Sequence, residues 1–467
     1  MPAVTIAAIS TPRGRGGIAV LRVSGDDAVT VAARVFMPAG GIPLTEAAPG
    51  RTLYGAFNCG GDIVDYGMAV VFRAPRSYTG EDTVELSCHG GIFIPDLILT
   101  SLIEAGASLA GPGEFTQRAL LNGKMTLTGA EAVAQLLECV SAAGAREAAA
   151  QSQGTLHKKI ADIAGRITRL LAGIYVTVDY PEEALSEISD EEIHLTVSDV
   201  LSEVGALCDS YGFGRAITEG IPAAIIGKSN TGKSTLFNLL ARDELAIVTD
   251  IAGTTRDVIE SRLSIGDIVL RIADTAGIRD TGDPVESIGI GRAVERARSA
   301  ELILAVFDRS APLDSDDFRI IELLKEVAHM GVKIIAVMNK SDIPADSASA
   351  PEFPPGTERV YISARDNTAD GYADAHECLR ERIAAMYRSG DYEAASGTVI
   401  TGQRQYAALC GARSSLESAE RALSAGFGRE CAGADLELAL SCLEECGTAR
   451  VSERIIDEIF ANFCVGK

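Results

Sequence analysis

The stretch Gly227-Lys228-Ser229-Asn230-Thr231-Gly232-Lys233-Ser234 fits the pattern G-x4-G-K-S and lies between an apolar segment, AAIIG, and a helix-like one, STLFNLLA. A strand-to-helix turn of this kind is what a phosphate-binding P-loop requires. Its backbone N–H groups can wrap phosphates, Lys233 can place a positive charge on the terminal ones, and the Ser234 hydroxyl can ligate Mg²⁺. A glycine-rich turn without a ligand is the alternative, and later motifs argue against it.

Three further motifs follow in the order of a GTPase. Asp274-Thr275-Ala276-Gly277 closes the segment IVLRIAD, where a carboxylate can hold Mg²⁺ through water and a glycine N–H can meet the γ-phosphate. Asn339-Lys340-Ser341-Asp342 ends KIIAVMN, and the Asp342 carboxylate can accept two donors from guanine that adenine does not offer. Ser363-Ala364-Arg365 begins at the last residue of RVYIS and completes the base pocket. Together the four motifs predict GTP binding and hydrolysis.

The segment between the P-loop helix and DTAG has the position of a first switch. Its predicted nucleotide contacts are Thr249, Asp250, Ile251, Ala252, Gly253, Thr254 and Thr255, and those of the P-loop extend from Asn230 through Thr235. Thr255 is the natural second Mg²⁺ hydroxyl. Ile278 occupies the place where Ras-type GTPases carry a water-orienting Gln, so another group must orient the water. Asn230 and the carbonyls of residues 249–254 can cage a monovalent cation that supplies positive charge instead.

The hydrophobic pattern divides the chain into four segments. Residues 1–120 mix strands and helices, including a hairpin around Cys59-Gly60-Gly61, and predict an α+β domain. Residues 121–217 and 389–467 are helical, whereas 218–388 alternate strands with helices, as in a mostly parallel sheet. We therefore expect an α/β P-loop domain inserted into an all-α domain and preceded by the α+β domain.

Composition limits the function classes. With 467 residues, 47% of them hydrophobic and 23% charged, the chain has the composition of a folded multidomain protein. Its net charge of -23 argues against a general nucleic-acid coat, so a partner would have to supply basic surface if RNA is the substrate. The ten cysteines form no CxxC pair or metal-cage spacing. The sequence also has neither a secretory signal pattern nor an apolar run of membrane-spanning length, which favours a cytoplasmic location.

Several motifs spread over the whole chain resemble those of the MnmE (TrmE) family of tRNA modification GTPases. They are ISTPRGRGGIAVLRVSG, SYTGEDTVELSCHGG, GPGEFTQRALLNGKMTLTGAEA, TDIAGTTRDV, DTAGIRD followed by VESIGI, and the terminal FCVGK. The resemblance implies a K⁺-activated GTPase whose G domains dimerise during hydrolysis. In one small departure, Lys228-Ser229 stands where members of the family often carry x-Pro, and in another Thr401–Gln405 is looser than the family's TNxRH.

The same resemblance implies roles for individual residues. Asn230, Thr249, Ile251 and Thr254 match the K⁺ ligands, Ser234 and Thr255 match the Mg²⁺ ligands, and Glu286 matches the glutamate that orients the attacking water. Arg22, Glu85, Lys124 and Lys467 match the positions that contact a 5-formyl-tetrahydrofolate type of one-carbon donor, and Cys464 matches a functionally required cysteine. Without the resemblance, surface salt bridges and a half-buried thiol would be the favoured interpretation of these last five.

The implied reaction adds a carboxymethylaminomethyl or aminomethyl group to C5 of the tRNA wobble uridine. It requires an FAD-dependent partner, MnmG, in a heterotetramer with a homodimer of this chain. Two alternatives stay open at this point. A ribosome-assembly or RNA-binding regulatory GTPase would share the G motifs but carry a basic RNA-binding module, which this acidic sequence does not display. A structural GTPase would assemble through its helical arms and bind no one-carbon cofactor.

Overall fold

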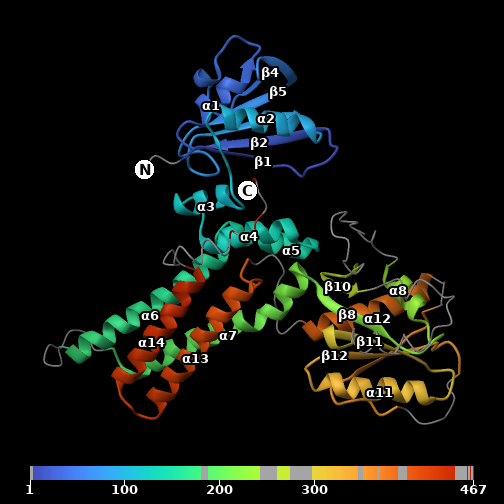
Figure 1. Cartoon of the computed structure of the whole chain (residues 1–467). Helices are drawn as coiled ribbons and strands as arrows, with labels where there is room; N and C mark the ends of the chain where they lie inside the picture. The colour runs from blue at the N-terminus through green and yellow to red at the C-terminus, as the bar shows by residue number, and fades with distance from the viewer. Residues whose placement is uncertain are drawn as a thin grey trace. The chain divides into compact units, whose positions relative to one another are not determined.

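The computed structural model describes residues 4–179, 188–241, 260–273, 297–344, 351–364, 369–387 and 397–447, with Phe460, Phe463 and Gly466. The chain divides into two compact units, one of residues 1–134, 151–196 and 414–467 and the other of residues 135–150 and 197–413. Figure 1 labels the helices and strands of both units.

The first unit opens with a seven-stranded sheet in the order β3-β4-β5-β6-β2-β1-β7. Its strands are β1 (Ile6–Ile9), β2 (Ile18–Ser24), β3 (Phe36–Pro38), β4 (Thr52–Cys59), β5 (Asp62–Phe72), β6 (Thr83–His89) and β7 (Ser108–Leu109). Only β1 and β7 pair in parallel. The predicted hairpin is confirmed, because β4 and β5 pair antiparallel around Gly60 and Gly61, which have φ angles of 65° and 100°.

Helices cover both faces of this sheet. On one face lie α1 (Ala28–Val35), α2 (Phe93–Glu104) and the 3-10 turn η1 (Leu44–Glu46) (Figure 1), whose apolar side chains join those of the strands in one buried core. On the other face α3 (Glu114–Leu121) buries Phe115 against Ile6 and Ala8. The part of the sheet under α3 is therefore covered on both faces, whereas Tyr54 and Met68 of β4 and β5 stay exposed.

Helices occur along the chain on both sides of the inserted domain, as the sequence predicted. They are α4 (Leu127–Glu138), α5 (Ala142–Ser152), α6 (Thr155–Asp179), α7 (Asp190–Thr218), α13 (Gln403–Ser424) and α14 (Arg429–Gly447). In the first unit α6 and α14 lie side by side (Figure 1), and Tyr175 Oη of α6 donates to Glu437 Oε1 of α14 at 2.7 Å. In the second unit the rings of Tyr211 and Tyr406 stack between α7 and α13, with centroids 4.2 Å apart.

The segment that leads from the inserted domain to α13 is held by a buried carboxylate. Glu147 on α5 is fully buried, and its two oxygens accept from Gly397 N at 3.0 Å and Val399 N at 2.8 Å. Ser210 Oγ on α7 accepts a hydrogen bond from the backbone amide of the following residue, Ile400, at 2.9 Å. These bonds satisfy backbone groups of a segment that has no strand partner, as burial requires.

The inserted domain contains a six-stranded sheet in the order β13-β12-β11-β8-β10-β9, parallel except for the β9–β10 hairpin. Its strands are β8 (Ile221–Ile226), β9 (Glu260–Ile265), β10 (Ile268–Ala273), β11 (Leu302–Asp308), β12 (Lys333–Asn339) and β13 (Glu358–Tyr361). The helices α8 (Lys233–Ala241) and α12 (Ala369–Tyr387) cover one face, and α11 (Ser315–Ala328) covers the other (Figure 1). This two-sided burial explains the continuous apolar strands, and it confirms the predicted inserted α/β domain.

Candidate functional site

The P-loop joins the end of β8 to the start of α8, and its two glycines are required by space. A Cβ on Gly227 would lie 2.5 Å from Val306 O, and one on Gly232 would lie 2.1 Å from Asn339 Nδ2. Gly232 also has φ 98°, and Asn230 has φ 61°, a region that Asn tolerates better than most side chains. The loop therefore turns back tightly over the neighbouring strands.

Lys233, the predicted phosphate-binding lysine, is oriented by the loop itself. Its Nζ donates to Lys228 O at 2.6 Å, and the same carbonyl accepts from Thr231 Oγ1 at 3.0 Å. Burial lowers the pKa of the Lys233 ammonium group. A phosphate would restore the charged form, because an opposite charge nearby favours ionisation.

Asn339 connects three of the predicted motifs. Its side chain is 4% exposed, its Nδ2 donates to Thr231 O at 2.8 Å, and its Oδ1 accepts from Ala364 N at 3.0 Å. The guanine-binding motif Asn339–Asp342, the P-loop and the Ser363-Ala364 segment therefore meet at the buried side-chain amide of Asn339. Sequence spacing alone did not show this connection.

Lys340 and Asp342 of the base motif have different surroundings. Lys340, at φ 61°, pairs with Asp308 at the end of β11. Burial opposes ionisation of Asp308, but hydrogen bonds from Lys340 and Ser310 outweigh it and lower the pKa of this carboxyl. Asp342 is exposed, which leaves its carboxylate accessible to the guanine base of a nucleotide.

The predicted residues fall into two sets. The described ones are Asn230, Thr231, Gly232, Lys233, Ser234, Thr235, Asn339, Lys340, Ser341, Asp342, Ser363 and Ala364, with Arg22, Glu85 and Lys124. Outside the described residues lie Thr249, Asp250, Ile251, Ala252, Gly253, Thr254, Thr255, Asp274, Thr275, Ala276, Gly277, Glu286, Arg365, Cys464 and Lys467. Of the predicted metal ligands, the described Asn230 and Ser234 offer an amide and a hydroxyl oxygen, donors that suit K⁺ and Mg²⁺. Their metal roles stay predictions.

Two of the predicted folate positions form a pair on the α3 face of the amino-terminal sheet. Arg22 on β2 and Glu85 on β6 are direct cross-strand partners, and Arg22 Nε and Nη2 reach Glu85 Oε1 at 3.1 and 2.7 Å. The rings of Tyr78 and Phe115 have their centroids 4.9 and 5.6 Å from the guanidinium carbon. Both Arg22 contacts use the same oxygen, so Glu85 Oε2 is not engaged by Arg22. This arrangement fits a pterin, because a carboxylate can accept hydrogen bonds from the N–H groups along one edge of the pterin ring.

Lys124 and the carboxyl-terminal motif approach the same domain. Lys124 Nζ donates to Pro75 O at 2.9 Å, on the loop that carries Tyr78. Gly466 has φ 98°, and Ser10 Oγ donates to Gly466 O at 2.9 Å. A Cβ on Gly466 would lie 2.3 Å from Ile9 O, so the backbone next to Lys467 lies against the end of β1. Sequence reasoning identified the terminal motif but missed the Ser10 contact.

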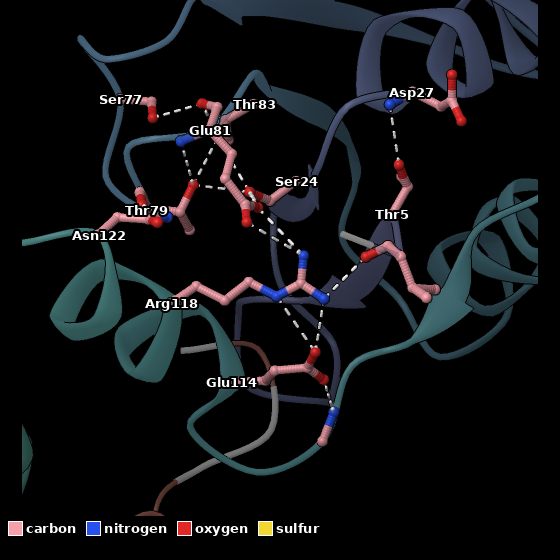
Figure 2. A network of polar contacts seen from close by, with 12 residues as sticks. Thr5, Ser24, Asp27, Ser77, Thr79, Glu81, Thr83, Glu114, Arg118 and Asn122 are labelled. Carbon is pink, nitrogen blue, oxygen red and sulfur yellow. Dashed lines mark hydrogen bonds and ion pairs between the residues drawn. The ribbon is translucent and has the colours of Figure 1, made fainter. Parts of the chain in front are cut away.

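A partly buried network beside the Arg22–Glu85 pair holds α3 to the sheet (Figure 2). Arg118 Nη1 reaches Glu81 Oε2 at 3.1 Å, and Arg118 Nη2 reaches Glu114 Oε1 at 2.7 Å and Val4 O at 2.8 Å. Ser24 Oγ donates to Glu81 Oε2 at 2.9 Å. The network links the residues just before β1, the end of β2, the loop before β6 and α3. Sequence reasoning missed it, although Glu81 lies within the segment SYTGEDT, and Glu114 and Arg118 within GEFTQR.

Two family models match the chain. The family described as "GTP-binding protein TrmE N-terminus" matches residues 5–124, and "MnmE helical domain" matches residues 127–464. The protein named "tRNA modification GTPase MnmE" of Symbiobacterium thermophilum is 40% identical over 99% of both chains. The chain belongs to the MnmE family of tRNA modification GTPases. Proteins of the same name from Carboxydothermus hydrogenoformans and Geobacillus kaustophilus are 39% and 37% identical, again over 99% of both chains.

The relatives in the MnmE family match 99% of this chain, so the match includes the inserted GTP-binding domain and both flanking regions. Among solved structures, the G domain of the T. maritima FeoB iron transporter is 22% identical, covers 36% of this chain and 99% of its own, and has a TM-score of 0.25. The family assignment rests on the full-length relatives. Within the described ranges, no helix combines the length and the apolar character needed to cross a membrane.

Proposed function

We propose that this GTPase acts with an FAD-dependent partner, MnmG, to add a carboxymethylaminomethyl or aminomethyl group to C5 of the tRNA wobble uridine. The observation that supports the nucleotide part most directly is the Asn339 amide, which joins the P-loop to Ala364 of the base pocket. The family name of the relatives supports the tRNA part. The conformational change that follows GTP hydrolysis, and not hydrolysis itself, would serve the uridine reaction.

In the proposed nucleotide site each group has one task. Lys233 neutralises the terminal phosphates, Ser234 and Thr255 hold Mg²⁺, and Asp342 recognises guanine. Asn230, Thr249, Ile251 and Thr254 would hold K⁺, which supplies the positive charge that an arginine finger supplies in other GTPases. Ile278 stands at the position of the water-orienting Gln of Ras-type GTPases and cannot orient water. Glu286 would orient the attacking water instead. G domains of a homodimer would meet during this step.

The amino-terminal domain would bind a formyl-tetrahydrofolate type of cofactor, which supplies the one-carbon unit when bound. Glu85 would accept from the pterin, and Arg22, Lys124 and Lys467 would complete the site. Cys464 would act in modification and not in GTP hydrolysis. The pairing of Arg22 with Glu85 and the contact of Gly466 with Ser10 support a site assembled from both ends of the chain. With tRNA and MnmG as partners, we place the reaction in the cytoplasm.

The first experiment is steady-state GTP hydrolysis by the full chain in K⁺ and in Na⁺ at matched ionic strength. Strong activation by K⁺ alone is expected from the cation cage. Equal, slow rates in both salts would contradict K⁺ activation and favour a regulatory GTPase. The uridine reaction is tested separately, by mass spectrometry of tRNA after incubation with MnmG, and Cys464→Ser should lose that product while its GTPase rate stays unchanged.

A further inference from the structure

Lys228, the second residue of the P-loop, directs its side chain away from the phosphate-binding turn toward the start of α11. Its Nζ donates to Asp314 Oδ2 at 2.8 Å and to Asp317 Oδ2 at 2.6 Å. The side chains of Lys228 and Asp317 are 18% and 2% exposed. The pair with Asp317 is thus largely shielded from water, and the attraction between opposite charges is stronger there than in bulk water.

The backbone of the same residue faces the phosphate-binding side. The Lys228 carbonyl accepts hydrogen bonds from both Lys233 Nζ and Thr231 Oγ1. Lys228 therefore connects two groups that do not touch: its side chain contacts α11, and its carbonyl contacts the phosphate-binding lysine.

The anchor on α11 is itself rigid. Asp314 is the N-cap of α11, its side chain accepts from Asp316 N and Asp317 N, and Asp314 N donates to Asp317 Oδ2 in a reciprocal capping box. The helix buries Ile321, Leu324 and Val327 against the sheet. A capping box of this kind satisfies the first N–H groups of a helix and fixes its first turn.

The P-loop needs an anchor because its sequence provides little stiffness. Gly227 and Gly232 lack side chains, so the backbone at both ends of the turn has few restraints on φ and ψ. An ion pair from the intervening residue to a capped helix supplies the missing restraint.

We infer that Lys228 is a positioning residue for the phosphates of the guanine nucleotide: the Lys228–Asp314–Asp317 cluster fixes the Lys228 carbonyl, and this carbonyl orients the Lys233 ammonium group. Lys228 itself contacts no phosphate in this arrangement. The inference rests on the nucleotide site of the proposed function, and it does not depend on K⁺, folate or MnmG.

The test compares binding of a fluorescent GDP analogue and of GTP to the full chain for Lys228→Met, Lys228→Arg, Asp314→Asn and Asp316→Asn. Asn is as good an N-cap as Asp, so Asp314→Asn removes a charge from the cluster and keeps the cap. Asp316 lies in the same helical turn, is 52% exposed and pairs with Arg319, which makes Asp316→Asn the matched control.

We expect Lys228→Met to weaken GDP and GTP binding about 10-fold or more, a loss of about 1.4 kcal/mol per factor of ten. Asp314→Asn should weaken it less, and Lys228→Arg and Asp316→Asn should bind within about twofold of the unchanged chain. The double variant Lys228→Met/Asp314→Asn should bind no worse than Lys228→Met, because both changes remove the same contact. A role in stability alone would lower the unfolding temperature without this pattern of affinities.

Unchanged nucleotide affinity in folded Lys228→Met, or fully additive losses in the double variant, would overturn the inference. If Lys228→Met does not fold, Asp314→Asn decides, and an affinity equal to that of Asp316→Asn overturns it. Absence of GDP and GTP binding by the unchanged chain would instead refute the nucleotide site of the proposed function.

Discussion

Replacing Arg118 tests whether the network in Figure 2 holds the amino-terminal domain together. The Arg118 side chain is 13% exposed, and its carboxylate partners Glu81 and Glu114 are 14% and 26% exposed. Arg118→Met keeps most of the apolar stem and leaves two shielded carboxylates without their cation. Removing one member of a buried ion pair costs about 3–5 kcal/mol.

The lower end of that range applies to Arg118→Met, because each carboxylate keeps another donor. Glu81 keeps the Ser24 hydroxyl at 2.9 Å, and Glu114 keeps Gly111 N at 2.8 Å. We therefore expect a loss of about 3 kcal/mol in the free energy of unfolding of this domain. For a domain of this size the loss lowers the unfolding temperature by roughly 10 °C.

The assay is differential scanning calorimetry of the full chain, with hydrogen exchange of the β1 and β2 amides to assign the affected transition. Arg118→Lys keeps the positive charge but lacks the planar guanidinium group that donates to both carboxylates. It should therefore lose less stability than Arg118→Met. Arg118→Met/Glu81→Gln should recover part of the loss, because one stranded charge is gone. A change below about 0.5 kcal/mol in Arg118→Met, typical of a surface substitution, would refute the reasoning. No recovery in the double variant would refute it as well.

Further predictions concern the second unit. Asp342→Asn should shift selectivity from GTP toward XTP by about 100-fold or more, because an amide can donate to the xanthine carbonyl, and competition binding measures the ratio. Gly232→Ala should abolish GDP binding, since the added Cβ would lie 2.1 Å from Asn339 Nδ2, and retained affinity in a titration would contradict the steric argument. Glu147→Ala should leave the buried Gly397 and Val399 amides without an acceptor and lower the free energy of unfolding in urea by about 2–4 kcal/mol. Glu147→Gln should lower it less.

A pH prediction follows from the Asp308–Lys340 pair. The pKa of Asp308 is lowered in the folded chain, so the pair stabilises the fold above the ordinary aspartate pKa of about 3.9 and loses this contribution as the pH falls through the folded value. Asp308→Asn should therefore flatten the acid side of the stability curve measured by thermal unfolding between pH 6 and about pH 3. An unchanged slope would show that the ion pair does not contribute.

The sequence by itself determined the nucleotide class and the order of the domains. The four G motifs were recognisable because backbone turns and base contacts need particular residue types within a few positions of one another. The inserted domain was recognisable because its strands, buried on both faces, are continuously apolar while the flanking regions have helical periodicity. The roles of Glu286, Cys464 and the K⁺ ligands come from family resemblance, and they stay predictions.

Only the tertiary structure decided which distant residues share a contact. Asn339 bonds to Thr231 and Ala364, Lys228 reaches α11, and Gly466 lies against the end of β1, all across long stretches of chain. Local propensity and periodicity describe neighbours along the chain, and they contain no information about which side chains meet after the strands have paired. Those contacts depend on sheet order and helix packing, which are properties of the folded chain as a whole.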